Sequence, residues 1–142
     1  MFTARGEPSR EPATAKEGPL AEQQVVLVIE DEEAIRRLVQ ETLADEGYEV
    51  LAAADAPEAF EVLQSQTVSL ILLDLLLAST DGEAFAASYL ERTEDPAPIV
   101  LLTAREDDGE RPPGVVAYLQ KPFDLDDLLQ MVDEHARPRA SE

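Results

Sequence analysis

The sequence predicts an α/β fold in which helices cover both faces of a parallel sheet of five strands. Three observations lead to this prediction. Short runs of Val, Ile and Leu alternate along the chain with segments whose apolar residues recur at helical spacing. The runs lack the polar alternation of half-exposed strands, which indicates burial on both faces. Strands that alternate with helices form right-handed βαβ crossovers, and these place the strands parallel in a doubly wound sheet.

Each predicted strand is a compact apolar run bounded by polar or turn residues. The second is the weakest, and the third runs directly into a charged residue, Asp74. The expected ranges are Val25–Ile29, Tyr48–Ala53, Leu70–Leu73, Ile99–Leu102 and Val115–Leu119.

Helices are predicted from start and stop signals as well as from periodicity. The first ends at Gly47, a typical stop. The second begins at Asp55, where the sequence Asp-Ala-Pro-Glu has the form of a capping box with Pro in the first turn. The third follows Gly82, and the last begins at the acidic residues around Asp124. The residues expected to face inward are Ile35, Leu38, Val39, Thr42 and Leu43; Ala59, Phe60, Val62 and Leu63; Phe85, Ala86, Tyr89 and Leu90; and Leu125, Leu128, Leu129 and Val132.

Length and composition fit one domain with disordered ends. The chain has 142 residues, of which 44% are hydrophobic and 5% aromatic, enough for one aliphatic core. Residues 1–23 are rich in Pro, Gly, Ala and Glu without periodicity, so we expect a disordered tail there and another at 137–142. Residues 24–136 form the predicted domain. The chain has no cysteine, which excludes disulfides and thiolate metal sites.

The composition also bears on location and partners. No signal peptide is visible, and the longest apolar stretch, 70–78, is interrupted by Asp74 and too short to span a bilayer. We therefore expect a cytoplasmic protein without a membrane partner. The formal net charge is −20, from 31 acidic and 11 basic residues. Such a chain repels nucleic acid and attracts divalent cations, although acidity also simply keeps a small protein soluble.

Unusual polar residues follow the strands at the ends where ligands bind in sheets of this kind. Glu30 and Asp31 follow the first strand, Asp74 the third, Thr103 the fourth and, shortly after the fifth, Lys121. The carboxyl ends of parallel strands lie at one edge of the sheet. We therefore expect these side chains to converge on one shallow pocket.

Taken singly, most of these residues have an ordinary structural explanation. Acidic residues after the first strand complement a helix dipole, Thr103 fits a helix N-cap, and Lys121 fits a solvated loop residue. Asp74 fits less easily, because it interrupts an apolar run where an unpaired buried charge is costly. Their coincidence at one sheet edge favours a functional site.

The chemistry of these groups suits phosphoryl transfer. Oxygen ligands suit a hard cation such as Mg²⁺, which uses one or two carboxylates. A carboxylate is a competent nucleophile toward phosphorus when cations neutralise the phosphoryl oxygens. Without a cation, Asp74 would experience repulsion from Glu30 and Asp31.

Four segments carry a resemblance to the receiver family of two-component signalling. They are VVLVIEDEEAIRRLV, LILLDLLLASTDGEAF, PIVLLTA and AYLQKPF, in the order expected of the family, and the resemblance extends over residues 23 to about 136. The resemblance implies a stand-alone response regulator receiver with a flavodoxin-like sheet in the order 2-1-3-4-5.

The resemblance also implies roles for individual residues. Asp74 would be the phospho-acceptor, Thr103 would contact the phosphoryl group, and Lys121 would pair with Asp74 or its phosphate. Tyr118 would be the switching aromatic. The bond between Lys121 and Pro122 would be cis.

The implied metal site departs from the family in detail. Mg²⁺ would be held by Glu30, Asp31, Asp74 and the backbone carbonyl of Leu76. Glu30 stands where an aspartate is more usual, and its longer side chain still offers an oxygen. Ala78 stands where the family often has proline, which implies a more mobile loop.

The segment between Thr103 and Lys121 is shorter than the family usually shows. Gly109, Pro112, Pro113 and Gly114 fall within residues 104–114, and proline costs about 3 kcal/mol in a helix interior. We therefore expect the family's fourth helix to be missing or reduced to about one turn, which puts the usual output and dimerisation face in doubt.

The resulting hypothesis is a phospho-accepting switch, not an enzyme with turnover on a metabolite. A sensor histidine kinase or phosphotransfer protein would donate the phosphoryl group, and output would pass to an unknown protein rather than to nucleic acid. A pseudo-receiver that keeps the fold without phosphorylation is an alternative. An aspartyl phosphatase is another, but it usually carries Asp-x-Asp after the nucleophile strand, whereas Leu76 stands in place of the second acid here. An FMN site is disfavoured by the four acids from 30 to 33.

Overall fold

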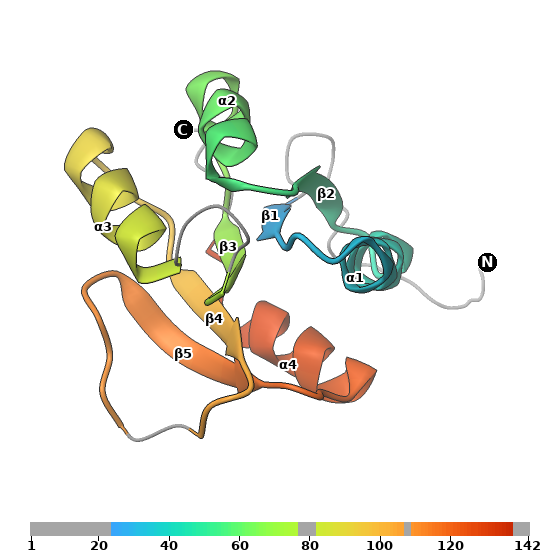
Figure 1. Cartoon of the computed structure of the whole chain (residues 1–142). Coiled ribbons are helices and arrows are strands. Elements are labelled where there is room, and N and C mark those ends of the chain that lie inside the picture. The colour runs from blue at the N-terminus through green and yellow to red at the C-terminus, as the bar shows by residue number, and fades with distance from the viewer. Residues whose placement is uncertain (1–23, 77–81, 107–108, 138–142) are drawn as a thin grey trace.

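The computed structural model describes residues 24–76, 82–106 and 109–137. Strands and helices alternate along the chain, as predicted, and each predicted strand agrees with the structure to within one residue (Figure 1). The elements are β1 (Val25–Ile29), α1 (Glu33–Asp45), β2 (Glu49–Ala53), α2 (Ala56–Ser65), β3 (Leu70–Asp74), α3 (Gly82–Arg92), β4 (Ile99–Thr103), β5 (Val115–Gln120) and α4 (Leu125–His135).

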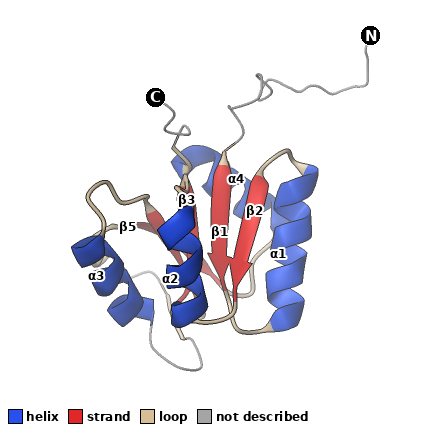
Figure 2. Cartoon of the chain, turned by 90° about the horizontal axis from the view of Figure 1, so that it is seen from above, coloured by secondary structure: helices blue, strands red, loops and turns tan. Residues whose placement is uncertain are grey.

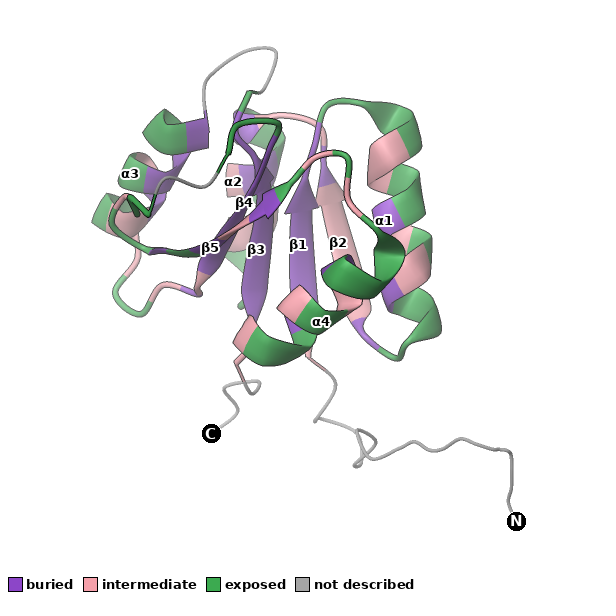
Figure 3. Cartoon of the chain, turned by 90° about the horizontal axis from the view of Figure 1, so that it is seen from below, coloured by how far each residue is buried: buried purple, intermediate pink, exposed green. Residues whose placement is uncertain are grey.

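The strands form one parallel sheet in the order β2-β1-β3-β4-β5, which confirms the predicted doubly wound topology. Helices α1 and α4 cover one face, and α2 and α3 cover the other (Figure 2). All five residues of β1, β3 and β4 are buried, which explains why these strands read as continuous apolar runs (Figure 3).

The helix ends match the sequence signals in part. In α2 the Asp55 carboxylate accepts a hydrogen bond from the Glu58 N–H (2.9 Å), which confirms Asp55 as the N-cap. The Glu58 carboxylate accepts from the Ala54 N–H (2.9 Å), one residue before the N-cap N–H that a capping box would use. Asp124 occupies the N-cap of α4, but its side chain makes no capping hydrogen bond.

Two residues predicted to face inward are exposed instead. Leu38 is 46% exposed and Leu125 is 38% exposed. On α1 the buried positions are Val39 and Leu43, four residues apart, so Leu38 lies at the margin of the apolar stripe. Leu125 is the first residue of α4, one turn before its first buried side chain, Leu128.

The connection between β4 and β5 contains no helix among its described residues, 104–106 and 109–114, and the fourth helix of the chain, α4, follows β5. The expectation of a missing or reduced helix is confirmed for these residues. Pro112 and Pro113 lack the N–H groups that a helix requires, and Gly109 and Gly114 have positive φ values of 87° and 84°.

The predicted tails lie mostly outside the described residues. Residues 1–23 and 138–142 belong to none of the described ranges, and the same holds for Ala78. Arg137, which the sequence places in the tail, donates its backbone N–H to the Ser69 carbonyl (3.1 Å) and pairs with the Asp95 carboxylate (3.1 Å). In the described part of the chain, no helix has the length and apolar character that a membrane crossing requires.

Gly82, the first residue of α3, lies close to the backbone at the end of β3. A Cβ atom there would lie 2.7 Å from the Asp74 carbonyl oxygen and 2.9 Å from the Leu75 Cα, and backbone atoms cannot yield as a flexible side chain does. The Gly82 N–H donates to the Leu75 carbonyl at 2.7 Å. The start of α3 therefore packs against the backbone of the residues around Asp74.

We predict that Gly82→Ala destabilises the protein by about 1–3 kcal/mol, the typical cost of overpacking. Helix propensity alone would favour alanine by about 1 kcal/mol, so the two effects have opposite signs. Urea unfolding followed by circular dichroism measures the change. Ala87→Gly, at an exposed position of α3, isolates the propensity term. A Gly82→Ala variant as stable as wild type would show that the close approach imposes no constraint.

Candidate functional site

The predicted site residues gather at the carboxyl edge of the sheet. Glu30 follows β1, Asp74 is the last residue of β3, Thr103 is the last residue of β4, and Lys121 follows β5. Asp74 is in register with Leu102 of β4. The parallel topology therefore brings together residues that are far apart in the sequence.

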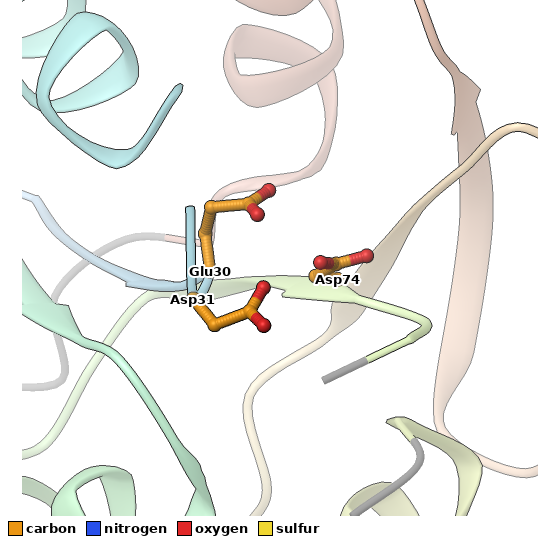
Figure 4. Close-up of side chains that lie close together, drawn as sticks. All are labelled: Glu30, Asp31 and Asp74. Carbon is orange, nitrogen blue, oxygen red and sulfur yellow. The ribbon is translucent and has the colours of Figure 1, made fainter. Parts of the chain in front are cut away.

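Three carboxylates form a cluster at this edge (Figure 4). Ligand oxygens of Glu30, Asp31 and Asp74 all lie within 4.8 Å of one another. Glu30 is 1% exposed and Asp74 is 6% exposed, whereas Asp31 is exposed. The spacing and the all-oxygen donor set fit a hard divalent cation, which Asp31 and Asp74 would bind directly at the exposed side of the cluster.

The Lys121 ammonium lies among these carboxylates. Its Nζ is 3.1 Å from the Glu30 Oε1 and 3.5 Å from the Asp74 Oδ1. Pairing with Asp74 was predicted, but the closer contact with Glu30 was not. The expected cis peptide bond between Lys121 and Pro122 is present.

The two partners of this pair have shifted acidities. Burial raises the pKa of Glu30, although the hydrogen bond from Lys121 opposes the shift, and the negative charge of Asp74 raises it further. Burial lowers the pKa of Lys121, but its hydrogen bond to Glu30 and the charges of Glu30 and Asp74 outweigh that effect. The pKa of Lys121 is therefore raised above its ordinary value.

Backbone N–H groups also donate to these carboxylates. The Leu76 N–H donates to the Asp74 Oδ1 (3.2 Å), and the Glu32 N–H donates to the Glu30 Oε2 (3.2 Å). Leu76 therefore lies at the site, and metal ligation by its carbonyl stays a prediction. Both Glu30 oxygens thus have a partner in the protein, Lys121 on one and a backbone N–H on the other. The carboxylate of Asp31, in contrast, is exposed.

Thr103 borders a small pocket next to Asp74. The pocket measures about 270 Å³ and is lined by Leu75, Leu76, Glu83, Thr103, Ala104 and Arg105. The Thr103 hydroxyl oxygen accepts a hydrogen bond from the Arg105 N–H (3.0 Å), so it closes a turn instead of capping a helix. The Arg105 guanidinium lies 3.6 Å from the Glu83 carboxylate across the pocket rim, and both side chains are more than half exposed.

Tyr118 lies in β5, opposite Leu101 of β4, and is half-buried. Its switching role stays a prediction. Sequence reasoning missed two contacts around it and the site, namely Arg105 with Glu83 and the guanidinium of Arg111 over the Tyr118 ring, whose centroid is 4.8 Å from Arg111 Cζ. Arg105 and Glu83 come from segments that are distant in sequence, and Arg111 and Tyr118 come from a loop and the strand that follows it, so no periodic pattern marks either contact.

These features define a class: a doubly wound α/β protein with a metal-compatible acidic cluster and a paired lysine at the carboxyl edge of its sheet. The family model of the response regulator receiver domain matches residues 26–133. The chain belongs to this family.

Known proteins agree with this assignment. Response regulator MprA of Mycolicibacterium vanbaalenii is 36% identical over 108 residues, which are 73% of this chain and 46% of that protein. Transcriptional regulatory protein YvrH of Bacillus subtilis is 35% identical over 117 residues, 79% of this chain and 48% of that protein. The chain thus spans about half the length of these curated relatives.

Solved structures show the same fold. The chemotaxis response regulator CheY4 of Vibrio cholerae has a TM-score of 0.72 and 29% identity, covering 79% of this chain and 98% of that one. A two-component response regulator from Clostridium difficile has a TM-score of 0.72 and 25% identity, covering 79% of this chain and 94% of that one. The match spans nearly the whole of each solved chain, which confirms the flavodoxin-like architecture.

We predict a specific pH dependence of stability from the raised pKa of Glu30. The folded chain keeps a proton on Glu30 at pH values where the unfolded chain has released it, from the ordinary pKa of 4.5 upward. This contribution is present at low pH and is lost as the pH rises through the folded pKa. Glu30→Gln has no such proton, so its free energy of unfolding should increase relative to wild type as the pH rises above 4.5.

Urea unfolding in metal-free buffer across this pH range tests the expectation. Glu41→Gln, on the exposed surface of α1, controls for the loss of one negative charge. If the difference between Glu30→Gln and wild type does not change with pH, or changes no more than it does for Glu41→Gln, burial does not raise the pKa of Glu30.

Proposed function

We propose that this chain is a Mg²⁺-dependent phospho-acceptor switch of a two-component phosphorelay, with Asp74 as the residue that takes the phosphoryl group. The observation that carries the proposal is the position of Asp74, the last residue of β3. Its carboxylate belongs to the three-carboxylate cluster and lies 3.5 Å from the Lys121 ammonium. Membership of the receiver family supports the same function.

The contacts of Asp74 support a role as the nucleophile. The Leu76 N–H and Lys121 hold its Oδ1, which leaves the second oxygen for attack on phosphorus. In the reaction, a bond forms between that oxygen and phosphorus while the bond from phosphorus to the donor breaks, and the donor leaves with the bonding electrons. Lys121 would stabilise negative charge on the phosphoryl oxygens, and the Thr103 hydroxyl would donate to one of them.

A divalent cation fits this site on electrostatic grounds. The carboxylates of Glu30, Asp31 and Asp74 carry three negative charges when ionised, against one positive charge on Lys121. Mg²⁺ would be held by Asp31, Asp74 and the backbone carbonyl of Leu76. Glu30 would contribute an oxygen through a longer contact. When bound, the ion supplies charge neutralisation for the transferred phosphoryl group.

The partners follow from this chemistry. A sensor histidine kinase or phosphotransfer protein in the cytoplasm would supply the phosphoryl group, and a protein would read the phosphorylated state. The net charge of −20 disfavours direct contact with nucleic acid. The protein would act as a switch, assisting at most its own phosphorylation and dephosphorylation.

This function predicts Mg²⁺-dependent phosphorylation on Asp74. Incubation with acetyl phosphate and Mg²⁺ should give a single phosphoryl adduct by intact mass, absent in Asp74→Asn and absent in EDTA. Lys121→Ala should slow its formation by on the order of 10²-fold, as when one charge-stabilising donor is lost. Asp124, like Lys121, follows β5, but it lies outside the three-carboxylate cluster. Asp124→Asn should therefore behave as wild type.

The failure of this experiment would also be informative. A folded protein that forms no adduct would contradict the proposal and favour the pseudo-receiver, in which the fold serves only as an interaction module. Sustained hydrolysis of a phosphate ester, with many turnovers per chain, would instead support the aspartyl phosphatase.

A second prediction concerns the metal. Asp31→Asn should weaken Mg²⁺ binding by at least about 10-fold, the loss typical of removing even a residue that supports a ligand. Asp45→Asn, at the exposed end of α1, should leave the affinity unchanged. Isothermal titration calorimetry measures both. Equal affinities of Asp31→Asn and wild type would mean that the cluster does not bind the metal through its exposed member.

A further inference from the structure

A cavity of about 350 Å³ lies at the amino edge of the sheet, the edge opposite Asp74. It is formed by the C-terminal halves of α2 and α3 and by the loops that lead from these helices into β3 and β4. The two helices lie side by side on one face of the sheet (Figure 2). The cavity is therefore separate from the three-carboxylate cluster and shares no residue with it.

Tyr89 brings a buried hydrogen-bond donor to the lining of this cavity. The residue is only 4% exposed, and its hydroxyl oxygen accepts a hydrogen bond from the Ala97 N–H (2.8 Å). Within the described part of the chain, no group accepts a hydrogen bond from the Tyr89 O–H. Because buried polar groups nearly always have a partner, such a donor calls for one from outside the protein. The Tyr89 hydroxyl is thus available to a molecule in the cavity.

Asp95 brings a carboxylate that the protein already holds in position. Its Oδ1 accepts from the Arg137 guanidinium (3.1 Å), which also donates to the Asp95 carbonyl (2.9 Å). Arg137 is held in turn, because its N–H donates to the Ser69 carbonyl (3.1 Å) and the Gln24 side chain donates to its carbonyl (2.9 Å). The Asp95 side chain is nevertheless 81% exposed, so it can accept from a ligand without first being ordered.

The charges around the cavity favour an uncharged ligand. The Arg137 cation balances the Asp95 carboxylate, so a second cation gains little there. An anion would be repelled by a chain whose formal net charge is −20.

The other lining residues favour a ligand with hydroxyl groups. The side chains of Gln66, Thr67 and Thr93 both donate and accept hydrogen bonds, as the hydroxyl groups of a ligand do. Leu63 and Val68 add an apolar surface that can pack against C–H groups. The volume is near the lower end of the range of ligand sites, about 300–1,000 Å³, so the ligand would be small.

We propose that this cavity is a second binding site, for a small uncharged molecule with several hydroxyl groups, such as a monosaccharide or a cyclic polyol. One hydroxyl of the ligand would accept from the Tyr89 O–H, and another would donate to the Asp95 carboxylate. The C–H groups of the ligand would pack against Leu63 and Val68. Binding here does not depend on the proposed function of Asp74.

Titration with myo-inositol, a cyclic polyol, tests the proposal by ¹H–¹⁵N NMR of the full chain without Mg²⁺ or phosphodonor. The Ala97 amide should shift and reach saturation, because it donates to the hydroxyl that the ligand would contact. The Asp95 amide should follow the same curve. The Leu76 amide, which donates to Asp74 at the opposite edge, should not shift.

Two variants remove polar groups of the cavity while they keep the size of the side chain. Thr93→Val should weaken myo-inositol binding by about 2- to 10-fold, as expected for the loss of one hydrogen bond. Tyr89→Phe should weaken it at least as much. Ser65→Ala is the matched control, because it removes an exposed hydroxyl at the end of α2 that does not line the cavity. Unchanged amide signals away from the cavity show that each variant is folded.

Methylammonium chloride and sodium acetate serve as charged probes, and neither should give a saturable shift of the Ala97 amide. The absence of a saturable shift with myo-inositol, up to its solubility limit, overturns the proposal and leaves the Tyr89 hydroxyl to water alone. A saturable response to either charged probe overturns the assigned ligand class. Equal affinities of Thr93→Val and wild type would place the bound probe elsewhere and overturn the site. Because no phosphoryl transfer enters these measurements, a failure of the proposed function leaves them unaffected.

Discussion

The site depends on one ammonium group between two buried carboxylates. β1 and β3 are neighbours in the sheet, so Glu30 and Asp74 lie side by side with little access to water. Lys121 reaches both, at 3.1 and 3.5 Å. Loss of one partner from a fully buried pair costs about 3–5 kcal/mol. Because Lys121 is 22% exposed, that range is an upper limit here. The same lysine therefore serves stability without a metal and would serve charge neutralisation during phosphoryl transfer.

The order of the strands makes this pairing possible. β1 and β5 are not adjacent, and two other strands lie between them, yet their carboxyl ends open onto one edge. Glu30 spans part of that distance because its side chain is one methylene longer than that of aspartate. Glu30 Oε1 thus comes within 3.1 Å of the Lys121 ammonium, while the exposed Asp31 remains the member of the cluster that is accessible to a cation.

The sequence was sufficient for the sheet because burial on both faces leaves a strong local signal. The fully buried strands β1, β3 and β4 are apolar at all their positions except the terminal Asp74 and Thr103, and those two exceptions indicated the site. Side-chain partnerships left no such signal. The choice of Glu30 as the closer partner of Lys121 depends on side-chain length and on the path of the backbone. Leu38 shows the same limit, since periodicity alone does not tell the margin of an apolar stripe from its centre.

The connection between β4 and β5 contains no helix among its described residues, so no helix of that connection packs on β5. A helix packed on β5 would bury a continuous apolar surface, and its movement would involve many contacts. Here the cover over Tyr118 includes a cation–π contact, a type of interaction that contributes about 0.5–1 kcal/mol at exposed sites. A free energy of that size changes an equilibrium by only about two- to fivefold, so this contact contributes far less than the burial of a helix's apolar face would.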